Sequence, residues 1–107
     1  MAREKFQTLT EQMFYILLCL RTEHCGTDIM GLVQVLTDGR VSVGPGTLYN
    51  LLESFLQAGY IRETKVQGRR RSYCITEAGQ QALDEEYRRL LKLAADYEAC
   101  TGQRGDA

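Results

Sequence analysis

The chain has 107 residues, which is enough for one domain with a single core. Hydrophobic residues make up 44% of it and charged residues 25%, which excludes the composition of an intrinsically disordered chain. The net charge of -1 excludes a uniformly basic surface, but six basic and only two acidic residues lie between positions 40 and 75, where we expect a local positive potential.

A capping pattern and an apolar stripe predict the first helix. Residues 8–11 have the form Thr-x-x-Glu, in which side chains satisfy the first free amides of a helix. Apolar residues then recur at the spacing of one helix face: Leu9, Met13, Ile16, Leu17 and Leu20. Gly26, Thr27 and Asp28 predict the start of a second helix, because an acidic residue suits the positive end of a helix dipole.

The sequence Gly-Pro-Gly at residues 44–46 predicts the start of a third helix. Proline is tolerated in the first helical turn, where its missing amide hydrogen has no partner, and Gly46 leaves room for another backbone to approach. A core-facing stripe follows at helical spacing: Leu48, Leu51, Leu52, Phe55 and Leu56. Thr47 and Asn50 point elsewhere and Tyr49 lies near the boundary, so this face can reach phosphates and base edges in a DNA major groove.

Two strands joined by a turn are predicted next, from Tyr60 to Val66 and from Arg69 to Ile75. Basic residues are frequent in this hairpin, and Lys65, Arg69, Arg70 and Arg71 lie around its turn. A charged hairpin edge can simply discourage aggregation between sheets. Three adjacent arginines, however, repel one another, and an anionic partner explains them better.

Thr76 and Glu77 predict the start of a long fourth helix. Its stripe continues for about four turns. A stripe of this length either folds back over its own domain or pairs with a second copy of the chain, and pairing is the interpretation we favour. The residues expected at this homodimer interface are Met13, Leu83, Tyr87, Leu90, Leu91, Ala94 and Tyr97.

The order of three helices, a hairpin and a further helix predicts a mainly α fold with a small β-hairpin, a winged helix-turn-helix. We expect residues 1–75 to form a winged helix DNA-binding domain with its wing at about 60–75. Residues 76–100 would form a C-terminal dimerisation helix and residues 101–107 a disordered tail.

Other classes of function are disfavoured by what the sequence lacks. The cysteines Cys19, Cys25, Cys74 and Cys100 include no C-x-x-C pair, so we expect free thiols, no metal and no cofactor, with a redox role left open for Cys25 and Cys100. The single His24 has no nucleophile aligned by spacing, which argues against an enzyme. No apolar run is long enough to span a bilayer and no cleavable leader is recognisable, so we expect a cytoplasmic protein.

The sequence resembles the PadR family of transcriptional regulators over residues 8–98. The motifs that carry the resemblance are Leu9-Thr10-Glu11 with the apolar run 14–18, Gly26 to Met30, Gly44 to Tyr49, Gly59-Tyr60-Ile61, and Arg69 to Gly79. The resemblance implies a homodimer that binds a pseudo-palindromic promoter site, usually as a repressor, with ligands releasing the DNA in some members. The short tail is similar to the subfamily with one C-terminal helix.

We expect three groups of DNA-binding residues. They are Pro45, Gly46, Thr47, Tyr49 and Asn50 in the recognition helix, Thr27 at the second helix start, and Lys65, Arg69, Arg70 and Arg71 in the wing. A winged-helix module that binds proteins rather than specific DNA is the alternative, and the acidic sequence pI of 5.8 is compatible with it.

Two departures from the family pattern limit what can be carried over. The second helix commonly starts Gly-Tyr-Glu in the family, whereas this chain has Gly26-Thr27-Asp28, so Thr27 offers only a hydroxyl. Drug-binding members use an aromatic platform, often tryptophan, at the dimer interface, and this chain contains no tryptophan. Tyr87 or Tyr97 could take that place for a small aromatic or phenolic effector, although a tyrosine in a helical stripe is more often plain core.

Overall fold

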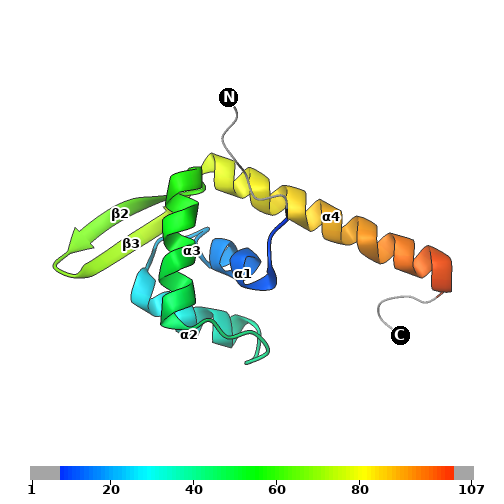
Figure 1. Cartoon of the computed structure of the whole chain (residues 1–107), viewed down its shortest axis with the longest axis horizontal. Coiled ribbons are helices and arrows are strands. Elements are labelled where there is room, and N and C mark those ends of the chain that lie inside the picture. Colours follow the sequence, from blue (N-terminus) through cyan, green and yellow to red (C-terminus); the bar gives the residue numbers. More distant parts are fainter. Residues whose placement is uncertain (1–7, 103–107) are drawn as a thin grey trace.

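The computed structural model describes residues 8–102 as four helices and a three-stranded antiparallel sheet (Figure 1). The elements are α1 (Glu11–Cys19), β1 (His24–Cys25), α2 (Gly26–Leu36), α3 (Pro45–Ala58), β2 (Ile61–Gln67), β3 (Arg70–Ile75) and α4 (Glu77–Thr101). This order confirms the predicted winged helix-turn-helix with a long C-terminal helix. Of the expected tail, Thr101 is still helical, and residues 103–107 lie outside the described residues.

Thr10 caps α1, two residues later than the predicted cap at Thr8. The Thr10 hydroxyl accepts a hydrogen bond from the backbone N–H of Met13 at 3.1 Å, and the Thr10 N–H donates to the Met13 sulfur at 3.4 Å. Met13 thus takes the place that Glu or Gln usually holds in a capping box. Thr8 is wrong as the cap because the hydroxyl two residues later lies within reach of the free amides.

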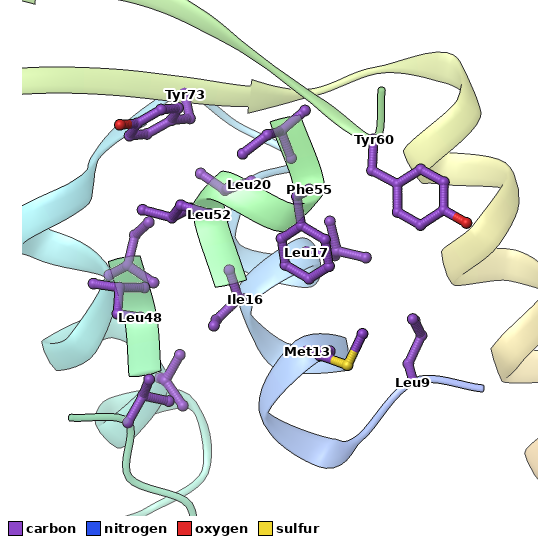
Figure 2. Packing of buried hydrophobic residues seen from close by; sticks show 14 of the residues in the cluster. Leu9, Met13, Ile16, Leu17, Leu20, Leu48, Leu52, Phe55, Tyr60 and Tyr73 are labelled. Atoms are coloured by element: carbon purple, nitrogen blue, oxygen red, sulfur yellow. The ribbon is translucent and has the colours of Figure 1, made fainter. Parts of the chain in front are cut away.

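One core joins the first three helices to the sheet and to the start of α4 (Figure 2). The largest fully buried side chains are Phe55, Ile16, Leu17, Leu20, Ile29, Leu48 and Val33. Phe55 stacks on Tyr60, with ring centroids 6.3 Å apart, and Tyr60 directly follows the left-handed Gly59 that ends α3. Packing against α3 therefore fixes where the hairpin leaves the domain.

The sheet has the order β1-β3-β2, with the predicted hairpin strands and one strand that the sequence did not reveal. β1 is two residues long and pairs with β3, opposing His24 to Tyr73 and Cys25 to Ser72. Two residues are too few to show the alternation of apolar and polar side chains from which a strand is predicted. Its pairing places the start of α2 beside the wing.

The first turns of α4 are fixed to the domain. Thr76 caps the helix by accepting from the Gly79 N–H at 3.1 Å, while its own hydroxyl donates to the Gly59 carbonyl at 2.6 Å. A Cβ atom on Gly79 would lie 2.1 Å from the carbonyl oxygen of Tyr60, so only glycine fits there. After these turns the helix extends away from the rest of the chain (Figure 1).

A buried carboxylate makes a second attachment of α4. Glu86, which is 5% exposed, accepts a hydrogen bond from the backbone N–H of Leu9 at 3.2 Å and forms an ion pair with Arg89. The Arg89 hydrogen bond is the main reason that the pKa of Glu86 lies below its usual value. α4 thereby holds the chain segment that enters α1.

Candidate nucleic-acid interface

The start of α3 exposes a polar face because its apolar residues are spaced to point inward. Leu48, Leu52 and Phe55 are buried at i, i+4 and i+7. Pro45 is the first helical residue and Gly44 the N-cap, as expected. The predicted DNA-contacting residues of this helix are all exposed: Pro45, Gly46, Thr47, Tyr49 and Asn50. Apart from its chain neighbours and the adjoining helix backbone, no described atom lies within 4 Å of the place where a Gly46 Cβ would stand, so a partner could approach the backbone closely there.

The wing carries its cations at and beside the turn. Gly68 has a φ of 62°, and the turn at residues 68 and 69 places Arg69 and Arg70 on exposed positions. Arg71 forms an ion pair with Glu63 across the hairpin at 2.7 Å, and the hydrogen bond with Glu63 raises the Arg71 pKa. Lys65 is exposed on β2 just after an irregularity in the pairing with β3.

The start of α2 packs closely against both α3 and the wing. A Cβ atom on Gly26 would lie 3.4 Å from ring atoms of both Tyr49 and Tyr73. Gly26 thus lets the two rings meet the first turn of the helix. Next to it, Thr27 is exposed, and the Asp28 carboxylate lies 3.9 Å from the Arg70 guanidinium. The predicted second-helix contact is therefore adjacent to the recognition helix and to the wing.

These three elements surround one open cavity of about 260 Å³. α2 contributes Thr27, α3 contributes Tyr49, and the wing contributes Arg69 and Arg71. Within the described residues, Arg69 forms no ion pair. Four residues predicted from separate parts of the sequence therefore share one cationic surface. The other predicted residues lie outside the cavity itself: Pro45, Gly46, Thr47, Asn50, Lys65 and Arg70.

Cys25 and Tyr73 also line this cavity. The sequence placed neither at the DNA-binding site, although it left a redox role open for Cys25. For Tyr73, the sequence did contain one signal: residues two apart on a strand share a face, so Tyr73 is expected on the same face of β3 as Arg71. Burial raises the pKa of Tyr73, which is 6% exposed. Cys25 has a lowered pKa because the hydroxyl and the backbone N–H of Thr27 form hydrogen bonds with it.

The residues expected at a dimer interface divide into two groups. Met13 and Leu83 are 5% and 3% exposed and belong to the core of the protomer. Farther along α4, large apolar side chains are in solvent: Tyr87 55%, Leu90 42%, Leu91 51%, Leu93 52% and Tyr97 58%. Ala94 is exposed among them. Leu93 was not among the residues predicted at the interface, although its side chain is as exposed as those of its neighbours.

Two features of the described residues bear on other functions. Among residues 8–102, no group of three or more His, Cys, Asp or Glu side chains could hold a metal ion. In the same part of the chain, none of the helices has the length and apolar character required to cross a membrane.

The sequence profile of the Transcriptional regulator PadR-like family matches residues 16–85. Among curated proteins, none matches the chain. A solved structure of a transcriptional regulator from Clostridium thermocellum is similar, with a TM-score of 0.72 and 18% identity, covering 85% of this chain and 92% of that one. F93 from STIV, a winged-helix DNA-binding protein, has a TM-score of 0.65 and 18% identity, covering 80% and 95%.

Bacillus subtilis PadR, solved in complex with operator DNA, is 25% identical to the chain with a TM-score of 0.61. That similarity covers 69% of this chain and 45% of the B. subtilis protein.

Proposed function

The chain belongs to the PadR-like family of transcriptional regulators, and we propose that it binds double-stranded DNA as a homodimer and represses transcription from a pseudo-palindromic promoter site. Each protomer would read one half-site. The B. subtilis relative solved with operator DNA supports this assignment.

The observation that carries the proposal is the shared cavity between α2, α3 and the wing. Thr27, Tyr49, Arg69 and Arg71 come from three elements that together span more than 40 positions of the sequence, yet they line one open surface. A polyanion bound there would touch all three elements at once. A set of solvated charges on unrelated surfaces would not converge in this way.

Within this proposal, α3 and the wing have different roles. Thr47, Tyr49 and Asn50 approach base edges or phosphates in the major groove, and the exposed Pro45 and Gly46 let the DNA backbone come close. On the other elements, Lys65, Arg69, Arg70 and Arg71 neutralise flanking phosphates and Thr27 offers a hydroxyl. Sequence preference then comes from the helix and most of the affinity from the wing.

The apolar face of α4 supplies the dimer contact in this proposal. Tyr87, Leu90, Leu91, Ala94 and Tyr97 recur at helical spacing on the part of α4 that its own domain leaves uncovered. Pairing of two such helices removes this face from water, which is the main driving force for association. A small aromatic or phenolic effector would bind beside Tyr87 and Tyr97 and release the DNA.

A mobility-shift assay with genomic fragments tests the proposal. The chain is expected to retain a small subset of fragments at moderate salt, and sequencing those fragments should reveal an inverted repeat with half-sites about one helical turn apart, roughly 10 base pairs. Retention of no fragment would contradict DNA binding and favour a module that binds proteins instead.

A further inference from the structure

The cavity at the candidate interface contains a polar group without a partner. Tyr73 lies on the middle strand of the sheet and is 6% exposed, and its hydroxyl points away from the core (Figure 2). Within residues 8–102, this hydroxyl forms no hydrogen bond. No buried side-chain nitrogen or oxygen among these residues lacks a hydrogen-bond partner, so the Tyr73 hydroxyl oxygen is open to the cavity rather than enclosed. Because Tyr73 lines the cavity, its hydroxyl is available to donate to a ligand with acceptor atoms.

The charges around the cavity define what kind of ligand fits. Arg69 and Arg71 line it, and only Arg71 has an acidic partner among the described residues. Arg70 is close by, at 3.9 Å from Asp28. Cationic side chains therefore outnumber carboxylates here, and a ligand with its own carboxylates would be attracted.

The same cavity holds a thiol in a setting that favours its ionised form. Cys25 directly precedes α2, and its sulfur lies 3.3 Å from the Thr27 hydroxyl. A helix N-terminus, hydrogen-bond donors and nearby arginines all stabilise a thiolate, which is the reactive form of cysteine. Cys19 shows the opposite behaviour, since burial in α1 raises its pKa. Cys100 is exposed near the end of α4, away from the wing, and provides an internal reference.

We propose that this cavity binds small anionic disulfides and that Cys25 exchanges with them to form a mixed disulfide, which prevents DNA from reaching α3 and the wing. The exchange itself depends only on the cavity. The effect on DNA binding rests on the proposed function.

The reaction is a thiol–disulfide exchange. The Cys25 thiol loses its proton to solvent, and the thiolate sulfur attacks one sulfur of the disulfide. A bond forms between these two sulfurs, while the original disulfide bond breaks and its electron pair leaves with the second thiolate. The oxidant is the small disulfide, which is reduced to a thiol as Cys25 is oxidised. Excess thiol reverses the step.

The geometry explains why this adduct would release DNA. A group attached to Cys25 fills the space between Tyr49 of α3 and Arg69 and Arg71 of the wing. Its carboxylates would pair with the arginines, which are then no longer available to phosphates, and they would repel the DNA backbone. One modification thus blocks the recognition helix and the wing together.

The test compares two reagents on the full wild-type chain. Dithiobis(nitrobenzoic acid) is a disulfide with two carboxylates, and dithiodipyridine is an uncharged one. After brief treatment with each, peptide mapping by mass spectrometry gives the ratio of modification at Cys25 to that at Cys100, which cancels the intrinsic reactivity of the reagent. We expect this ratio to be about tenfold higher for the anionic reagent.

Two variants test whether this preference comes from binding of the reagent in the cavity rather than from exposure of the Cys25 thiol. Arg69→Ala removes a cation and Tyr73→Phe removes only the free hydroxyl, so each should lower the preference for the anionic reagent. Circular dichroism confirms that both still fold. Equal ratios for the two reagents in the wild-type chain would overturn the proposal.

DNA binding provides the second readout. The Cys25 adduct should lose at least about tenfold in affinity for DNA and recover it when excess thiol is added, whereas Cys25→Ser should bind DNA and not respond to the reagent. An adduct that binds DNA as tightly as the untreated chain would overturn this inference while leaving the proposed function intact. An untreated chain that never binds DNA would overturn the proposed function, and the reagent preference would still be measurable.

Discussion

The two longest helices of the protein, α3 and α4, differ in how much of their apolar face is buried. α3 buries its stripe of Leu48, Leu52 and Phe55 completely within the protomer and leaves a polar face in solvent. α4 buries only its first turns and then presents Leu90, Leu91 and other large apolar residues to solvent. The apolar stripe of α3 is thus buried within a single chain, whereas much of the apolar stripe of α4 is exposed.

The difference shows what each exposed surface can bind. The exposed face of α3 and the adjoining wing are polar and cationic. Such a surface is well solvated, and its positive potential attracts a polyanion. The far half of α4 exposes apolar side chains at helical spacing, and a contiguous apolar face of this kind is typical of protein–protein interfaces. Each of the following changes affects one of these surfaces or the junction between them.

The largest effect is expected from charges placed on the apolar face of α4. Leu90→Glu with Leu91→Glu should abolish the proposed homodimer, because a symmetric pair loses four leucines at about 2 kcal/mol each, which together weaken association by roughly a millionfold. Sedimentation at several concentrations measures the change. Lys92→Glu is the matched control, since the helical period puts residue 92 on the opposite side of α4, and it should leave the dimer intact. A dimer that survives the double change would place the interface elsewhere.

The junction between the two surfaces depends on Gly79. Gly79→Ala should destabilise the fold by about 3 kcal/mol, because the new methyl group would overlap the Tyr60 carbonyl and push the first turn of α4 off the sheet. Chemical denaturation at a fixed protein concentration measures the loss. Gly31→Ala provides the control with the opposite sign: this glycine lies in α2 with nothing within 4 Å of its Cβ position, so alanine should stabilise the helix by about 1 kcal/mol.

The wing should control affinity without controlling sequence preference. Replacing Arg69, Arg70 and Arg71 with alanine is expected to weaken binding to every duplex by about a hundredfold and to lower the salt slope by about 3, because up to three phosphate contacts are lost. Titrations at several salt concentrations give both quantities. Arg40→Ala is the control, since this arginine pairs with Glu11, away from the wing. An unchanged salt slope in the triple variant would show that the wing does not contact phosphates.

The smallest effect is expected at Asn50. Asn50→Ala should reduce the preference for the cognate site over unrelated DNA by about tenfold, with little change in binding to unrelated DNA, because asparagine reads base edges through hydrogen bonds. Competition titrations with the two duplexes measure the ratio. Ser54→Ala is the comparison one turn farther along α3, where the serine hydroxyl already donates to the Asn50 carbonyl. If both duplexes weaken equally in Asn50→Ala, the residue contacts the backbone instead.

Local chemistry in the sequence was sufficient to predict much of the fold. Pro45 marks the first residue of α3 and Thr76 caps α4 because each has a short-range reason to be there. The α1 cap was predicted at Thr8 because only Thr8 has a glutamate three residues later, whereas the actual cap, Thr10, has Met13 at that position. β1 was missed because two residues carry no periodicity, although their pairing brings Cys25 to the wing.

The candidate site was less accessible to sequence reasoning, because it depends on where distant elements meet. The apolar stripe of α4 has the same spacing at Leu83 and at Leu90, yet the first is in the core and the second is in solvent. Only packing against α1 and the sheet determines which turns are covered. Likewise, the sheet register determines that Tyr73 and Cys25 share a cavity with Tyr49, and no local pattern contains that information.

The central claim is that the start of α2, the exposed face of α3 and the wing bind one duplex together. Amide chemical shifts of the labelled chain, titrated with a duplex recovered from the genomic fragments, test this most directly. The account predicts that Thr27, Tyr49, Asn50 and residues 69–71 shift together with one binding curve, while the far half of α4 keeps its shifts. Changes confined to α4, or at the wing without α3, would contradict it.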